Sequence, residues 1–184
     1  MANEFVRQSV HLGIGVLAAI GTLLVDRTTY LIVCGLAVVG AAFFVLLAFA
    51  RSKRLAATLE RDHAAFRGKG AIFFGLGVWL TALLFWEHAA LAILLLAIPD
   101  ALATMAGVLV KSGPLPYNHR KSWGGSAVFF VSASILLSVR YPELSIFFIT
   151  FLLTALESFD YREIPFLDDN LVIPLVAGFL LAYL

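Results

Sequence analysis

One aspartate stands alone within a long apolar stretch of the chain. Asp100 follows Pro99 and is the only ionisable residue between positions 89 and 110. A charge inside a membrane-spanning helix is costly and is usually retained for function. Because Pro99 lacks a backbone N–H, we expect a kink that frees a polar carbonyl group beside the carboxylate. Asp100 is therefore a candidate catalytic and metal-binding residue, and a buried ion pair is the alternative.

A second set of acidic residues precedes the last apolar stretch. Asp168, Asp169 and Asn170 are consecutive, and Glu157 lies shortly before them. Hard cations such as Mg²⁺ prefer carboxylate oxygens, so Asp100, Glu157, Asp168 and Asp169 would together suit Mg²⁺ bound to a nucleotide. Helix capping explains one of the adjacent aspartates but not both. No Cys/His spacing typical of zinc is present.

A basic loop rich in hydroxyl groups and glycine leads into the apolar stretch at 124–139. It ends in Lys121-Ser-Trp-Gly-Gly-Ser126. The start of a helix offers free N–H groups and a positive dipole end, and glycine lets a phosphate approach them closely. Arg120 and Lys121 would add positive charge. The order of residues is not that of a Walker A loop, and an ordinary basic loop is the alternative.

Three polar residues near the N-terminus share one helix face. Glu4, Arg7 and His11 are spaced i, i+3 and i+7, which aligns their side chains on a helix. Either this stripe serves a functional site, or Glu4 and Arg7 form a solvated pair and only His11 is buried.

The elements that position these residues are expected to be membrane helices. The chain has 184 residues, of which 61% are hydrophobic and 14% charged, and its mean hydropathy is +0.96. A soluble domain is about 45–50% apolar and 25% charged, so a soluble fold and a nucleic-acid-binding module are excluded. At about 20 residues per crossing, the apolar stretches are 4–25, 29–50, 70–86, 89–110, 124–139, 143–157 and 170–184. We predict one all-α, multi-span domain over 1–184, with about seven spans.

The basic residues predict the orientation of this bundle. Seven spans divide the connecting segments into two sides, and 11 of the 13 Lys and Arg fall on the side of the N-terminus. Only Arg27 and Arg140 fall on the other side. By the positive-inside rule, the N-terminus and the loops near 51–69, 111–123 and 158–169 are cytoplasmic.

Four motifs in this order resemble those of the polyprenol kinase family, which includes dolichol kinase, phytol kinase and the CTP-dependent diacylglycerol kinases. The motifs are 4–11, 70–77, 100–107 with 121–126, and 168–174. The third motif, 100–107 with 121–126, is similar to the nucleotide-site signature of the CTP-dependent cytidylyltransferases. Pro114 and Pro116 depart from the family spacing.

The resemblance implies transfer of the CTP γ-phosphate to the hydroxyl of a membrane lipid alcohol with Mg²⁺. The alcohol would be a polyprenol, a phytol-like isoprenoid alcohol or diacylglycerol. We expect catalysis by Asp100, Asp169 and either His11 or a carboxylate as proton acceptor, and Mg²⁺ held by Asp100, Glu157, Asp168 and Asp169. The expected nucleotide-binding residues are Arg7, Lys69, Lys121, Ser122, Gly125, Ser126 and Asn170.

Two alternatives remain at this point. A CTP:phosphatidate cytidylyltransferase-like enzyme would use similar residues but release pyrophosphate. A small transporter would use Asp100 as an ion site, although the two halves of the chain show no inverted repeat.

Overall fold

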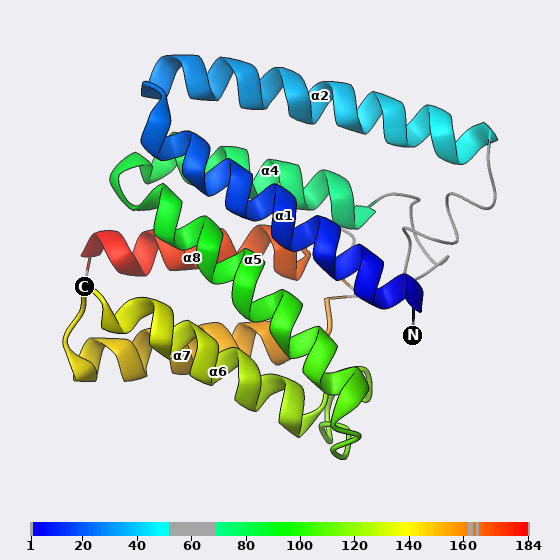
Figure 1. Ribbon diagram of the computed structural model, residues 1–184, viewed down its shortest axis with the longest axis vertical. Coiled ribbons are helices and arrows are strands. Elements are labelled where there is room, and N and C mark those ends of the chain that lie inside the picture. Colours follow the sequence, from blue (N-terminus) through cyan, green and yellow to red (C-terminus); the bar gives the residue numbers. More distant parts are fainter. Residues whose placement is uncertain (1, 52–68, 162–163, 165, 184) are drawn as a thin grey trace.

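The computed structural model describes residues 2–51, 69–161, 164 and 166–183, and these fold into seven α-helices without a strand. The prediction of an all-α bundle is confirmed, and each apolar stretch coincides with one helix (Figure 1). The helices are α1 (Ala2–Leu24), α2 (Arg27–Arg51), α4 (Lys69–Leu84), α5 (Trp86–Leu109), α6 (Trp123–Ser138), α7 (Glu143–Ser158) and α8 (Asp169–Tyr183).

The helices fall into two length classes. Among the described residues, α1, α2 and α5 each contain a stretch long and apolar enough to cross a membrane. The helices α4, α6, α7 and α8 have only 15 or 16 residues. At about 1.5 Å per residue they extend roughly 23 Å, which is less than the roughly 30 Å of a hydrocarbon core. Their ends therefore leave room for polar loops at membrane depth, where such loops must be covered by protein.

The central helix of the bundle is α5, which packs against α1, α4, α6 and α8. Small residues allow two close approaches between helices, as expected for membrane bundles. A Cβ on Gly15 of α1 would collide with Ala97 of α5, and a Cβ on Gly77 of α4 would collide with the backbone of Asn170. The second approach fixes the start of α8 against α4. The fully buried core side chains include Ile93, Leu95, Leu96, Phe129, Leu137, Ile149, Leu153 and Ile173.

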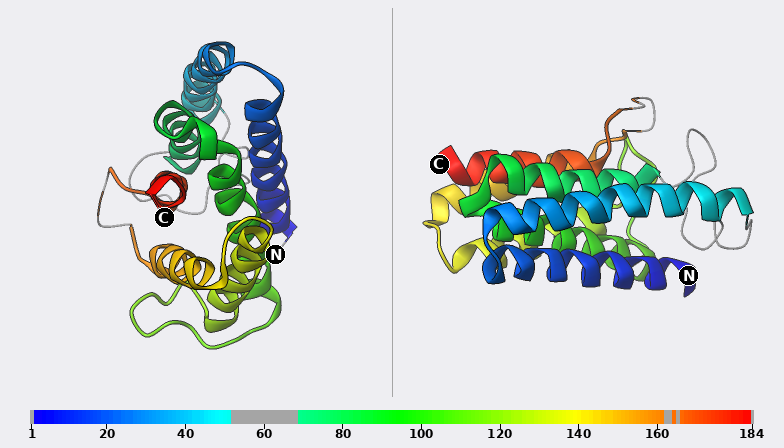
Figure 2. Two further views of the ribbon diagram at one scale, coloured as in Figure 1. Left: turned by 90° about the vertical axis from the view of Figure 1, so that its left-hand side faces the viewer. Right: turned by 90° about the horizontal axis from the view of Figure 1, so that it is seen from above.

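By contrast, α2 lies at the edge of the bundle. It packs mainly on α4, and Figure 2 shows it along one side of the molecule. Its outward residues are large and apolar, and they remain exposed in the isolated chain: Ile32, Val33, Leu36, Val39 and Phe43. An apolar helix with so little protein around it is typical of a helix that faces lipid. The fold is therefore that of a helical membrane bundle.

Candidate active site

The loop between α5 and α6 is attached to the end of α7. Asn118 is buried, and its amide nitrogen donates to the carbonyl oxygen of Ser158 at 3.0 Å. The hydroxyl of Tyr117 donates to Ser158 Oγ at 2.9 Å. Leu115, also buried, accepts and donates backbone hydrogen bonds within the loop. These bonds bring Lys121, near the end of the loop, against α7.

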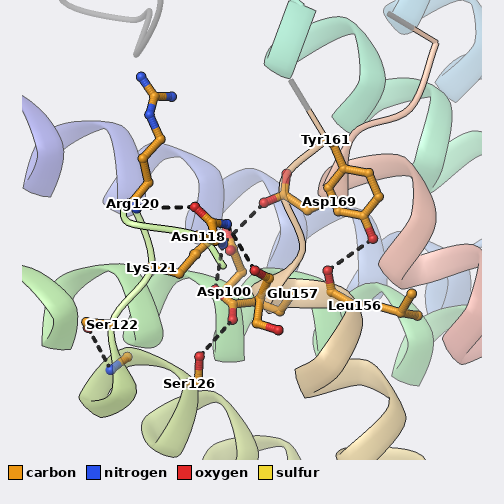
Figure 3. A network of polar contacts seen from close by, with 12 residues as sticks. Asp100, Asn118, Arg120, Lys121, Ser122, Ser126, Leu156, Glu157, Tyr161 and Asp169 are labelled. Atoms are coloured by element: carbon orange, nitrogen blue, oxygen red, sulfur yellow. Dashed lines mark hydrogen bonds and ion pairs between the residues drawn. The ribbon is translucent and has the colours of Figure 1, made fainter. Parts of the chain in front are cut away.

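Lys121 is the centre of an ionic cluster (Figure 3). Its Nζ lies 2.5 Å from Glu157 Oε1 and 3.4 Å from Asp169 Oδ2. The hydroxyl of Ser126 lies 3.4 Å from the other oxygen of Glu157, whose side chain is only 3% exposed. Burial lowers the pKa of Lys121, but the charges of Asp169, Glu157 and Asp100 outweigh it, so the pKa lies above its usual value. The ammonium group is therefore held charged among three carboxylates.

The first turn of α6 borders this cluster, and all of its N–H groups have acceptors within the protein. Ser122 caps the helix by accepting from the N–H of Gly125 at 3.1 Å, and Ser112 Oγ accepts from Gly124 at 2.8 Å. Backbone carbonyls accept the N–H groups of Trp123 and Ser126. The free N–H groups that the sequence led us to expect are thus already satisfied. A phosphate here would meet the helix dipole and side chains first, and would reach Gly124 only by replacing the Ser112 hydroxyl.

A cavity of about 350 Å³ opens between the second half of α5, the α5–α6 loop and the start of α6. This volume falls in the range of small-molecule sites, which is roughly 300–1,000 Å³. Lys121 and Glu157 lie in its wall, and it descends to Ala103, one turn above Asp100. Helix α5 continues to Leu109, so Asp100 lies within the helix, one turn below the lining of this cavity.

The start of α8 carries the two adjacent aspartates in different environments. Asp168 Oδ1 accepts from the backbone N–H of Asn170 at 3.2 Å and from its side-chain amide at 2.8 Å, while Asp169 faces Lys121. Burial and the neighbouring charge of Asp169 raise the pKa of Asp168 to about 7. The hydroxyl of Tyr161 donates a hydrogen bond to the backbone carbonyl oxygen of Leu156. Burial, together with the charge of Asp169, raises the pKa of Tyr161 to about 12. A cation would therefore be stabilised strongly at this helix start.

Helix α1 contributes a separate group of polar side chains. The Nε2 atom of His11 lies 3.7 Å from Asp100 Oδ2, and the imidazole ring packs against Phe74 with centroids 4.5 Å apart. Arg7 forms an ion pair with Glu4. The polar stripe predicted on this helix therefore faces the protein at His11, where it meets Asp100.

The structure gathers most of the predicted site residues at one end of the bundle. Asp100, Lys121, Glu157 and Asp169 interact electrostatically, and Ser122, Gly125 and Ser126 line the cavity. Asn170 orients Asp168 and does not line the cavity. Lys69 is the first residue of α4, but its side chain lies outside the described part of the chain.

The predicted four carboxylates do not form a ready coordination sphere. Within the described residues, no group of three or more His, Cys, Asp and Glu side chains is arranged to hold a metal ion. Lys121 instead neutralises Glu157 and Asp169. The donor chemistry still suits Mg²⁺, because carboxylate oxygens converge on a position that already holds a positive charge.

Several residues of the site were missed by sequence reasoning. Thr104 and His119 line the cavity, Asn118 fastens the loop, and Gln8 is buried on α1 beside the His11 turn. A helical spacing of four from Asp100 could have indicated Thr104. The sequence held no signal for Asn118, because its partner is 40 residues away.

Comparison with known proteins finds relatives over most of the chain. An uncharacterized protein of Methanocaldococcus jannaschii is 30% identical, and the alignment covers 97% of this chain and 93% of that protein. Phytol kinase 1 of Arabidopsis thaliana is 31% identical over 63% of this chain and 43% of the kinase. Farnesol kinase of the same plant is 30% identical over 61% of this chain and 43% of that kinase. The chain thus spans less than half of these plant kinases.

No family model matches the chain. No solved structure matches it either.

Proposed function

The chain belongs to the polyprenol kinase family, and we propose that it transfers the γ-phosphate of CTP to the hydroxyl of an isoprenoid alcohol in the membrane. The observation that carries this proposal is the Lys121 ammonium, held between Glu157 and Asp169 in the wall of a cavity. A lysine beside the positive end of a helix dipole is suited to bind a phosphate group. Phytol and farnesol kinases among the relatives support the alcohol as acceptor.

Phosphoryl transfer depends mainly on positioning and charge neutralisation. In the proposed reaction, a bond forms between the alcohol oxygen and the γ-phosphorus. The bond from that phosphorus to the bridging oxygen breaks, and CDP leaves with the electron pair. The hydroxyl proton passes to an acceptor at the inner end of the site, where Asp100 and His11 lie. Lys121 would orient the phosphates and offset the charge that develops on them.

The acidic residues would hold a magnesium ion in this reaction. We propose Asp169 and Asp100 as ligands, with Glu157 and Asp168 completing the set. When bound, Mg²⁺ would supply positive charge that stabilises the negative charge of the phosphates. Asn170 would keep Asp168 oriented through the hydrogen bond that it already makes.

The choice of nucleotide gives a direct test. Purified protein in detergent, with Mg²⁺ and phytol or farnesol, should phosphorylate the alcohol with CTP and do so less well with ATP. The measurements are the lipid phosphate and the released nucleotide product. Equal or better use of ATP would reject CTP as donor and keep the kinase. Release of pyrophosphate would instead indicate a cytidylyltransferase.

We also propose that the active site faces the cytoplasm. Eleven of 13 basic residues support this orientation, and Figure 1 places the N-terminus and the Lys121 loop at one end of the bundle, opposite the C-terminus.

Labelling from outside intact cells tests the orientation, in a background in which Cys34 is replaced by serine. Single cysteines at the exposed positions Glu87 and Glu143 should react with a membrane-impermeant maleimide. Cysteines at Pro116 and Phe166, which are exposed at the other end, should react only after permeabilisation. Labelling of Pro116→Cys in intact cells would place the site outside.

A further inference from the structure

Two buried polar atoms on α1 have no hydrogen-bond partner among the described residues: Gln8 Oε1 and His11 Nε2. Gln8 is only 4% exposed, and its amide nitrogen donates weakly to Glu4 at 3.4 Å, which leaves the oxygen unsatisfied. A buried acceptor without a partner costs about 1–3 kcal/mol. Native structures rarely keep such a group unless a ligand or water satisfies it.

One of these two atoms, His11 Nε2, lies close to Asp100. Residues 8 and 11 are spaced i and i+3, so both side chains leave the same face of α1. Phe74 holds the His11 ring, and the 3.7 Å between Nε2 and Asp100 Oδ2 is too long for a direct hydrogen bond. One turn further, Gly15 packs directly against Ala97 of α5. A group that satisfies Gln8 and His11 therefore lies on the N-terminal side of this close contact.

The outer face of α1 is apolar. Val6, Val10 and Ile14 are about half exposed in the isolated chain. In a membrane this face meets lipid, so only the helix α1 separates the unsatisfied atoms of Gln8 and His11 from the acyl chains. A ligand with one hydroxyl group and a long apolar chain matches both environments.

We propose that Gln8 and His11 form the subsite for the hydroxyl group of the lipid alcohol. In the bound ground state the hydroxyl donates to Gln8 Oε1 and accepts from His11 Nε2, which places its oxygen beside Asp100. For phosphoryl transfer the O–H group turns from Gln8 to the Asp100 carboxylate, which accepts the proton. This inference rests on the proposed function for the reaction that the bound alcohol undergoes, but not for the binding of the alcohol itself. The binding of a long-chain alcohol can be measured without nucleotide or metal.

The test compares phytol with its methyl ether, which has the same chain but no hydroxyl hydrogen. A site built to accept a hydrogen bond discriminates strongly against an analogue that cannot donate it. In detergent, phytol should bind the wild-type protein at least about tenfold more tightly than the ether. In the isosteric variant Gln8→Met this preference should fall to about twofold or less. The KM for phytol should rise while the KM for CTP stays unchanged.

The matched control is Thr81→Val. Thr81 is fully buried on α4, and its hydroxyl is also without a partner among the described residues. It lies about two turns along α4 from Phe74, the residue that contacts His11. This variant should therefore keep the wild-type preference for phytol. Gln8→Leu serves as a second variant if Gln8→Met folds poorly.

The outcomes separate the two proposals. Equal binding of phytol and its ether by the wild-type protein would overturn the hydroxyl subsite, and so would an unchanged preference in the Gln8 variants. A preference that depends on Gln8, in a protein that transfers no phosphate from any nucleotide, would confirm the subsite and reject the kinase function.

Discussion

Asp169→Asn should give a folded protein that has lost at least about 100-fold of its kcat. Asp169 starts α8 and lies 3.4 Å from the Lys121 ammonium. Asparagine keeps the shape of the side chain and an oxygen that can cap the helix, and Lys121 keeps Glu157 as its ion-pair partner, so the stability should change little. The variant removes a full negative charge from the proposed metal site. Initial rates at saturating CTP, Mg²⁺ and alcohol, together with a thermal melt, measure both effects.

Asp26→Asn is the matched control. Asp26 also stands at a helix start, where its carboxylate accepts from the backbone N–H of Thr29 at 3.0 Å. It lies in the short connection between α1 and α2, away from Lys121, so the same chemical change should leave kcat within about twofold. Near-normal turnover of Asp169→Asn would reduce Asp169 to a helix cap. The metal site would then rest on Asp100 and Glu157.

The helices were predictable because each one coincides with one apolar run. The predicted stretch 89–110, for example, became α5 (Trp86–Leu109), and 143–157 became α7 (Glu143–Ser158). The hydropathy of a run predicts where a helix begins and ends, but it does not predict which other helices pack against it. The central position of α5 depends on close contacts such as Gly15 against Ala97, which join residues far apart in the sequence.

The sequence predicted which residues belong to the site, but it did not predict which of them form ion pairs with one another. The basic and acidic motifs indicated Lys121, Glu157 and Asp169 separately. Their ion pairs join positions 36 and 48 residues apart, and they depend on the loop that Asn118 fastens to α7. No local pattern encodes such a connection.

Two further features depended on three-dimensional context. The hydroxyl of Ser112 accepts a hydrogen bond from the N–H of Gly124 at the start of α6. The sequence had led us to expect that this N–H was free to bind a phosphate. Gln8 is an ordinary polar residue in the sequence, and only its burial and its unsatisfied oxygen mark it.

The ion pair between Lys121 and Glu157 should dominate both stability and activity. Lys121→Met leaves the carboxylate of the buried Glu157 without its main partner. Removing one partner of a buried ion pair costs about 3–5 kcal/mol, so the unfolding temperature should fall sharply. Activity should be lost as well, because the ammonium group proposed to orient the phosphates is gone. Loss of activity in this variant alone would therefore not separate folding from catalysis.

The double variant Lys121→Met/Glu157→Gln separates them. A neutral glutamine no longer leaves a buried charge unpaired, so most of the lost stability should return, while phosphoryl transfer stays at least about 100-fold below wild type. Lys111→Met, at an exposed position of the same loop, controls for the loss of a lysine and should change neither quantity. If the double variant regained activity with stability, Lys121 would be only a structural partner of Glu157. If it stayed as unstable as the single variant, the unpaired charge of Glu157 would not be the cause of the instability.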